Sequence, residues 1–331
     1  MRVLVTGGAG FLGRWVVKRF LDDGDSVTAF DNLSNGSEEN IVEFMKNKSY
    51  NSKFVFVGGD ITNANELERA FASFSPDICV HCAAQINVQE SLDFPENAFK
   101  GNVIGTYIVL EECRKSQKGS KKTKLILIGT CMVYDTAGAA SGAGTAISET
   151  HSTKPASPYA GSKMAAEELA LSYYRGIGLP VVVLRPFNIY GPFQKTNMEG
   201  GVVNIFIKRA LEGQDLNIFG DGKQTRDLLY VEDCADFIFK AATKDESAGE
   251  VINAGTGKDV SINDLAKTIN EAVGGKSQIK HVPHHHPQAE IMKLLCDSSK
   301  ARKMLGWEAK TSLESGIRKT IEWMKTEAKI R

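Results

Sequence analysis

The sequence predicts an α/β fold in which a doubly wound parallel sheet is followed by a smaller C-terminal α/β domain. Six short runs rich in Val, Ile and Leu recur before Arg185, and longer segments with helical spacing separate them. Continuous apolar strands of this kind are typical of a parallel sheet with both faces covered. After Arg185 the alternation stops at a series of prolines and glycines. We therefore expect one domain over residues 1–185, completed by part of 225–255, and a second over 186–331.

The expected elements follow one another along the chain in a regular order. The expected strands cover residues 3–5, 27–30, 54–57, 78–82, 125–128 and 181–184. The expected helices cover residues 11–21, 66–74, 103–113, 162–174 and 202–211. Residues 135–148 are small and polar, so we expect a mobile surface loop near the functional site.

Composition restricts the class of protein. The 331 residues carry 40 basic and 40 acidic side chains, so no overall field attracts a polyanion such as nucleic acid. The first apolar run, residues 3–5, is too short for a signal peptide or a membrane span. We expect a soluble cytoplasmic protein with no nucleic-acid partner and no membrane partner.

Except for one pair, the six cysteines are widely separated in the sequence, and their spacing does not suggest a disulfide framework. Cys79 and Cys82 have the spacing of a redox motif, but they lie in an apolar run. We therefore expect them to be buried residues of a strand, and we expect all six thiols to be reduced.

A glycine-rich turn joins the first expected strand to the first expected helix. Residues 6–13 read TGGAGFLG. In a Rossmann-type fold such glycines allow a tight turn, let the backbone approach a pyrophosphate, and let the helix pack closely on the strand. The N-terminus of the helix also offers free N–H groups to phosphate oxygens. The residues expected to contact a dinucleotide here are Gly7, Gly10, Phe11, Leu12 and Gly13.

The second expected strand leads into Asp31 and Asn32, about twenty residues beyond the glycines. A dinucleotide fold places a carboxylate at this point to accept hydrogen bonds from the adenosine ribose. A 2′-phosphate would meet a like charge there, so Asp31 favours NAD over NADP. A solvated turn residue is the structural alternative for Asp31.

Tyr159 and Lys163 stand four residues apart at the start of an expected helix, so their side chains lie on one face. We expect the ammonium of Lys163 to lower the pKa of Tyr159 from about 10, which would make the phenol a general base near neutral pH. Thr130 follows an expected strand at the carboxyl edge of the sheet, where its hydroxyl can bridge a substrate oxygen and Tyr159. A hydroxyl that only satisfies the strand-end backbone is the alternative for Thr130.

These motifs resemble the extended short-chain dehydrogenase/reductases, the family of NAD-dependent nucleotide-sugar epimerases and dehydratases. The further stretches that carry the resemblance are residues 31–34, 59–61, 81–85, 102–106, 130–134, 158–163, 185–188, 190–192, 220–222, 226–227, 299–302 and 305–307. The resemblance covers nearly the whole chain. It implies a Rossmann domain that holds NAD tightly, a C-terminal domain that binds the nucleotide diphosphate of a sugar donor, and a homodimer.

The resemblance also implies roles for individual residues. Asp60 and Ile61 would flank the adenine. The other residues expected to line the cofactor site are Asn32, Ala83, Ala84, Gln85 and Asn102. Asn188 and Arg226 would hold the diphosphate, and Phe219 would pack against the base, although an aromatic residue at a strand end is as often part of a core. The expected substrate-binding residues are Asn188, Phe219, Arg226 and Glu290.

The chain departs from the dehydratase pattern directly after Thr130. Dehydratases of the family carry Asp-Glu there to move the protons of an elimination, whereas this chain has Cys131 and Met132. Because Met132 cannot exchange a proton, we expect a 4-epimerase of a UDP-sugar that acts through a transient 4-keto intermediate. A dehydratase or a decarboxylase remains an alternative, because the thiol of Cys131 can serve as an acid or a base. A non-catalytic NAD-binding protein is the remaining alternative, although it would not require Thr130, Tyr159 and Lys163 together.

A second departure is a histidine-rich segment, residues 281–286, where relatives commonly place a phosphate-binding arginine. A solvated loop, a phosphate contact and a metal site are the three interpretations. No ligand spacing supports the third, so we expect no metal site.

Overall fold

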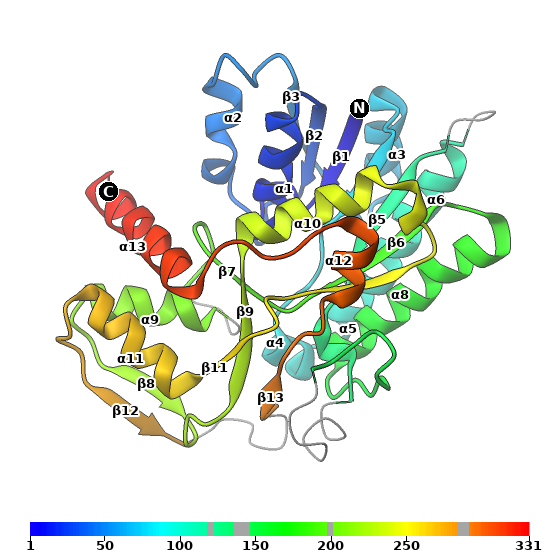
Figure 1. The fold of residues 1–331 in the computed structure, drawn as a ribbon. Helices are drawn as coiled ribbons and strands as arrows, with labels where there is room; N and C mark the ends of the chain where they lie inside the picture. The colour runs from blue at the N-terminus through cyan, green and yellow to red at the C-terminus, as the bar shows by residue number, and fades with distance from the viewer. Residues whose placement is uncertain (118–121, 136–145, 197–200, 284–290, 331) are drawn as a thin grey trace.

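The computed structural model describes residues 1–117, 122–135, 146–196, 201–283 and 291–330, and its largest element is a seven-stranded parallel sheet (Figure 1). The strands are β1 (Arg2–Thr6), β2 (Ser26–Asp31), β3 (Phe54–Gly58), β4 (Ile78–His81), β5 (Lys124–Ile128), β6 (Val181–Pro186) and β10 (Val251–Ala254). Their order is β10-β6-β5-β4-β1-β2-β3, and every neighbouring pair is parallel. This order confirms the predicted doubly wound sheet and its six expected strands; the seventh strand, β10, was not predicted.

Each face of the sheet is buried under helices because successive strand residues point to opposite sides. Val3 and Val5 belong to a core with α1 (Phe11–Asp22), α10 (Val231–Thr243) and α12 (Ser299–Leu305). Leu4 belongs to the core of the opposite face. The helices of that face are α3 (Ala64–Phe74), α6 (Gly105–Lys115) and α8 (Pro158–Ile177). Strands that are apolar at most positions are therefore required, as the sequence indicated.

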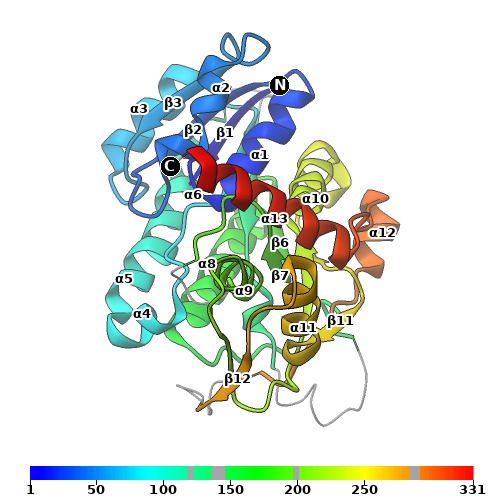
Figure 2. The ribbon, with the colours of Figure 1, turned by 90° about the vertical axis from the view of Figure 1, so that its left-hand side faces the viewer.

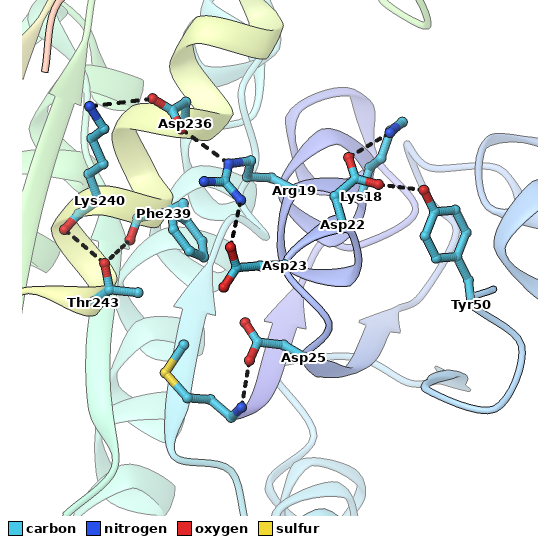
Figure 3. Close-up of polar contacts among 11 residues, drawn as sticks. Lys18, Arg19, Asp22, Asp23, Asp25, Tyr50, Asp236, Phe239, Lys240 and Thr243 are labelled. Atoms are coloured by element: carbon cyan, nitrogen blue, oxygen red, sulfur yellow. Dashed lines mark hydrogen bonds and ion pairs between the residues drawn. The ribbon is translucent and has the colours of Figure 1, made fainter.

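Helices α1 and α10 pack against each other although they lie far apart in the sequence. Arg19 Nε donates to Asp236 Oδ1 at 3.1 Å, and its guanidinium lies 3.6 Å from the ring centroid of Phe239 (Figure 3). Surface ion pairs of this kind add at most about 1 kcal/mol each. The apolar contacts beneath them hold α10 on the sheet, and β10 follows α10 back into the sheet beside β6.

The remaining elements form a second lobe with its own core. Its strands are β7 (Asn188–Tyr190), β8 (Leu216–Phe219), β9 (Thr225–Tyr230), β11 (Asp259–Ser261), β12 (Ile279–Val282) and β13 (Lys293–Leu294), and its helices are α9 (Val202–Leu211), α11 (Ile262–Val273) and α13 (Leu313–Ile330). In Figure 2, α13 crosses the molecule between α1 and α11. The predicted boundary near residue 186 stays a prediction.

An aromatic cluster joins the two lobes next to the glycine turn. The guanidinium of Arg14 is buried, with its carbon 3.8 Å from the ring centroid of Phe193 and 4.6 Å from that of Trp15. Trp15 Nε1 donates to the carbonyl of Pro192 at 3.2 Å, and the ring of Phe193 lies 4.9 Å from that of Trp323 on α13. The cluster therefore fixes the segment that follows β7 against the first turn of α1.

The connections between these elements are short helices and turns. They comprise η1 (Glu38–Asn40), α2 (Val42–Lys46), α4 (Val88–Asp93), α5 (Pro95–Ala98), the π-helical η2 (Phe99–Ile104), η3 (Cys131–Val133) and η4 (Asp245–Ser247). The helix expected at 103–113 therefore begins as a π-helical turn before α6.

Three sequence expectations are changed or refined by the fold. Residues 136–145 of the expected mobile loop lie outside the described residues, but its end is not a surface segment, because Ile147 is 2% exposed and its N–H donates to Leu295 at 2.7 Å. Cys79 is buried in β4, as expected, whereas Cys82 directly follows β4 and is only half-buried; all six cysteines are free thiols. Within the described part of the chain, no helix is long and apolar enough to cross a membrane.

Candidate active site

The glycine turn lies where the strand order reverses. Strands β2 and β3 continue on one side of β1, and β4 begins the series on the other side. Ligands of doubly wound sheets bind in the crevice at the carboxyl ends of the strands beside such a reversal.

Two glycines of this turn are required by the packing. Gly7 has φ +69°, and a Cβ on it would lie 2.7 Å from the N atom of Ala83, the second residue after β4. A Cβ on Gly13 would lie 1.9 Å from the carbonyl oxygen of Gly7. The turn, the segment after β4 and the start of α1 are therefore packed too closely for side chains.

Asp31 ends β2 beside this turn and is 7% exposed. Its Oδ2 accepts from the N–H of Ala9 at 3.0 Å, and its Oδ1 accepts from that of Leu33 at 2.8 Å. Burial raises the pKa of the Asp31 carboxyl, and these N–H groups oppose the shift because they favour the carboxylate. The side chain is thus an anchored carboxylate rather than a solvated turn residue.

A cavity of about 330 Å³ opens beside this carboxylate. Its lining residues are Asp31, Asn32, Leu33, Gly58, Gly59, Asp60 and Glu66. Asn32 Nδ2 donates to Asp60 Oδ2 at 2.9 Å, so the two predicted adenosine-site residues are joined. Ile61 lies deeper, because it is 8% exposed and belongs to the core beneath α3 and α6.

Asp31 leads to a prediction about cofactor choice. The wild-type protein should bind NAD about 30-fold more tightly than NADP, the effect of roughly 2 kcal/mol of repulsion between the carboxylate and a 2′-phosphate. Isothermal titration calorimetry of both nucleotides at one ionic strength measures the ratio. Asp31→Asn keeps the shape of the side chain but removes its charge, so it should reduce the ratio of NAD affinity to NADP affinity. Equal affinities in the wild-type protein would refute the assignment of Asp31.

The end of β5 faces the first turns of α8. Ser157 caps this helix by accepting from the N–H of Ala160, and Pro158 stands at its first position. Lys163 Nζ donates to the carbonyl of Ile128 at 2.5 Å. The Thr130 side chain lies close enough to the Tyr159 hydroxyl to lower its pKa. The fold therefore brings the predicted Thr130, Tyr159 and Lys163 together.

The expected effect of Lys163 on the phenol is wrong for this arrangement. Burial raises the pKa of Tyr159 to about 12, and the nearby Thr130 hydroxyl opposes that shift only in part. Burial lowers the pKa of Lys163 to about 8, although Glu167 opposes this shift. Desolvation is the largest effect on the pKa of both side chains, so Tyr159 holds its proton at neutral pH. A further positive charge beside it would favour the phenolate.

Asn102 holds the segment after β4 against α8. Its Oδ1 accepts from the N–H of Gln85 at 2.8 Å, and its Nδ2 donates to the carbonyl of Gln85 at 3.0 Å and to Ser162 Oγ at 2.9 Å. Asn102 is 1% exposed, so these bonds fix the segment of Ala83, Ala84 and Gln85 rather than present a free amide. Gln85 Oε1, in contrast, is buried and has no hydrogen-bond partner among the described residues.

Sequence reasoning assigned no role to His81, which connects the glycine turn to this network. Its Nδ1 lies 2.7 Å from Thr6 Oγ1, and its Nε2 lies 3.0 Å from Thr106 Oγ1. Thr106 in turn donates to the carbonyl of Asn102 at 2.6 Å. Burial, with Lys163 contributing, lowers the pKa of His81 to about 3, so the ring is neutral. The signal in the sequence for the contact between Thr6 and His81 was that each polar residue ends one of two neighbouring expected strands.

Cys131 follows Thr130 in η3 and is 4% exposed. Burial raises the pKa of its thiol to about 12, and Arg226 opposes this shift. Cys131 belongs to an apolar cluster that includes Ile147 and Cys296, and Met132 packs against the same cluster. The thiol is therefore protonated at neutral pH and unsuited to removing a proton from carbon.

The predicted substrate-binding residues come from neighbouring elements of the second lobe. Asn188 lies on β7, and its Oδ1 is buried without a hydrogen-bond partner among the described residues. Arg226 lies on the adjacent β9, and its Nη1 donates to the carbonyl of Ile291 at 2.6 Å. Phe219 ends β8 and is 40% exposed, so it is not a core residue.

The histidine-rich segment is only partly described. Glu290 and His284 to His286 lie outside the described residues. His281 Nε2 lies 2.9 Å from Asn263 Oδ1 on the exposed side of β12. Within the described ranges, no group of three or more His, Cys, Asp or Glu side chains is arranged to hold a metal ion.

The residues at the reversal of strand order fit NAD. The two glycines let the turn pack closely against the start of α1, Asp31 offers a fixed carboxylate beside the 330 Å³ cavity, and Gln85 offers an unused buried oxygen. When bound, NAD would be held by these groups.

Comparison with known proteins agrees with this arrangement. The profile of the GDP-mannose 4,6-dehydratase family matches residues 4–320. A UDP-glucose 4-epimerase of Mycolicibacterium smegmatis is 37% identical over 99% of this chain and 100% of its own length. A dTDP-glucose 4,6-dehydratase of Shigella flexneri is 32% identical over 98% of this chain and 92% of its own length.

Solved structures extend the comparison to the fold. Pal from Bacillus thuringiensis is 52% identical with a TM-score of 0.90, covering 99% of this chain and 100% of Pal. The UDP-glucose 4-epimerase of Thermus thermophilus, solved as a complex with NAD, is 32% identical with a TM-score of 0.86, covering 98% of this chain and 99% of that chain. Epimerases and dehydratases therefore stand at similar distances from this sequence.

Proposed function

Because the chain belongs to the extended short-chain dehydrogenase/reductase family of NAD-dependent nucleotide-sugar epimerases and dehydratases, we propose that it is a 4-epimerase of a UDP-sugar. The observation that carries the proposal is the pair after Thr130. Cys131 is buried in an apolar cluster, and Met132 has no proton to exchange. An elimination needs groups that move protons at C5 and C6, whereas an epimerisation at C4 does not.

The chain's own residues support the epimerase chemistry as follows. Tyr159 exchanges the proton of the C4 hydroxyl, and Thr130 holds the same oxygen. When bound, NAD would supply the reversible hydride transfer at C4. Asn188 and Arg226 hold the diphosphate, so the 4-keto sugar stays in the site while its ring presents the other face. Positioning supplies most of the catalysis in such a scheme.

The choice between epimerase and dehydratase is tested by the product formed in deuterated water. We expect a product with the mass of the substrate and no deuterium on carbon, because the hydride lost from C4 is the hydride returned. The substrate panel consists of UDP-, GDP-, CDP- and dTDP-sugars, and mass spectrometry and NMR identify the product. Cys131→Ala should keep most of the turnover.

The matched control for Cys131→Ala is Cys113→Ala, which removes a fully buried thiol from α6, in the core under α3, α6 and α8. A product lighter by one water, or carrying deuterium on carbon, together with a collapse of activity in Cys131→Ala alone, would establish the dehydratase. Cys131 directly follows Thr130 in η3, which is the observation favouring that second candidate. No turnover of any sugar, with NAD still bound, would favour the non-catalytic protein.

We also propose that the chain forms a homodimer, as the resemblance implies. An apolar surface over α4, α5, η2 and α6 supports this proposal. Its exposed residues are Leu92, Phe94, Phe99, Ile104 and Tyr107. An apolar surface of this kind is typical of a protein interface.

A further inference from the structure

One face of α8 presents three functional groups to three consecutive residues of the chain. Tyr159, Lys163 and Glu167 follow one another at four-residue intervals, so they line one side of the helix. Lys163 Nζ donates to the carbonyl of Ile128. A Cβ on the next residue, Gly129, would lie 2.2 Å from Glu167 Oε1. The Glu167 carboxylate therefore lies against the backbone of Gly129, and the Tyr159 side chain lies near Thr130, the residue that follows Gly129.

Glu167 is held in this position by Arg185 at the end of β6. Its Oε2 accepts from Arg185 Nε at 2.9 Å and from Nη2 at 2.6 Å. Glu167 is 1% exposed and Arg185 5% exposed. Because both bonds reach Oε2, Oε1 is left to face Gly129. A buried ion pair contributes little net stability compared with apolar residues of similar size, so its presence beside a catalytic pair points to another role.

The charges around Lys163 indicate what that role is. Burial lowers the pKa of His81 to about 3 and raises that of Cys82 to about 12, so both groups are neutral at pH 7. Glu167 is the carboxylate that opposes the loss of charge from Lys163. Burial raises the pKa of the Glu167 carboxyl itself, and Arg185 opposes this shift, so Arg185 favours the ionised form.

We propose that Glu167, held by Arg185, is a positioning residue whose buried carboxylate keeps the positive charge of Lys163 beside Tyr159. This inference rests on the proposed role of the Tyr159 and Lys163 pair, but it does not depend on which sugar is the substrate. Removing the negative charge makes every proton of that pair easier to lose.

NMR of the protein labelled with ¹³C at the lysine ε-carbons tests the proposal without a substrate. Two lysines should titrate near pH 8, because burial lowers the pKa of both Lys163 and Lys124 to about 8. Lys163→Met and Lys124→Met assign the two signals. Lys124 is an internal control, since it begins β5 and lies about 13 Å along the strand from Ile128. Its Nζ donates to α10 carbonyls, at 3.0 Å for Ala241.

Glu167→Gln should move the Lys163 midpoint about one pH unit lower and leave that of Lys124 unchanged. Glu167→Asp keeps the negative charge, so its Lys163 midpoint should lie closer to the wild-type value. Because Glu167→Gln leaves Arg185 buried without its partner, the double variant Glu167→Gln with Arg185→Met provides a folded alternative. It should show a smaller downward shift, because the positive charge of Arg185 is lost as well. An unchanged Lys163 midpoint in Glu167→Gln, or a midpoint above the wild-type value in the double variant, would overturn the proposal.

Activity provides a second measurement that separates this role from a structural one. If the protein turns over a nucleotide sugar, both limbs of the pH profile of kcat should move to lower pH in Glu167→Gln, because a nearby negative charge is lost. A purely structural defect would lower kcat at all pH values without moving the limbs. Absence of turnover would count against the proposed epimerase, whereas the lysine titration would still decide the role of Glu167.

Discussion

Tyr159→Phe should lower turnover by about 10²–10⁴-fold, the range that general acid–base catalysis supplies. The substitution removes only the hydroxyl, which lies near the Thr130 side chain. The ring stays, and so does the backbone N–H that donates to Ser91 Oγ at 3.0 Å. Folding and NAD affinity should therefore be unchanged. Steady-state kinetics on the sugar found in the substrate panel, with thermal unfolding alongside, measures the effect.

The same helix offers a matched control. Tyr173 lies farther along α8, and its hydroxyl donates to Glu111 Oε1 at 2.7 Å, away from the strand ends. Tyr173→Phe loses one hydroxyl of the same kind and should keep nearly all activity. Near-normal turnover in Tyr159→Phe, or equal losses in the two variants, would leave Tyr159 as a packing residue.

Gly13→Ala should weaken NAD binding by about 100-fold or more. The added Cβ would lie 1.9 Å from the carbonyl oxygen of Gly7, and backbone cannot move aside as a flexible side chain can. The glycine turn must therefore shift, at a cost of about 1–3 kcal/mol from overpacking, before the pyrophosphate loses its contacts. Calorimetric titration with NAD measures the affinity, and the thermal midpoint without NAD separates destabilisation from lost binding.

Gly176→Ala is the control, because Gly176 lies near the end of α8 with nothing within 4 Å of an added Cβ. It should bind NAD normally and gain up to about 1 kcal/mol of stability from the better helix propensity of alanine. Wild-type NAD affinity in Gly13→Ala would contradict the packing argument for the turn.

The sequence indicated the sheet well because its signals are local. Apolar runs separated by helical segments predicted six of the seven strands of the parallel sheet, and the fold confirms them. The seventh strand, β10, was not predicted because its run VINA is short and follows β9, a strand of the second lobe. Only the packing of α10 on α1 returns this segment to the sheet. Ile147 was misjudged for a related reason: a single apolar residue beside a polar segment becomes buried when distant elements meet it.

Some features of the candidate site were predicted from local sequence signals, and others depended on the tertiary structure. Residue type and spacing along the chain predicted the glycine turn, Asp31, Thr130, Tyr159 and Lys163, because strand ends and helix turns impose those spacings by themselves. The protonation of Tyr159 and Lys163 depended on the tertiary structure, since burial comes from elements distant in sequence and outweighed the attraction expected from spacing alone. Arg185 meets Glu167 for the same reason: β6 and α8 are adjacent only in the fold, where the low dielectric gives their charges an effect that no sequence pattern reports.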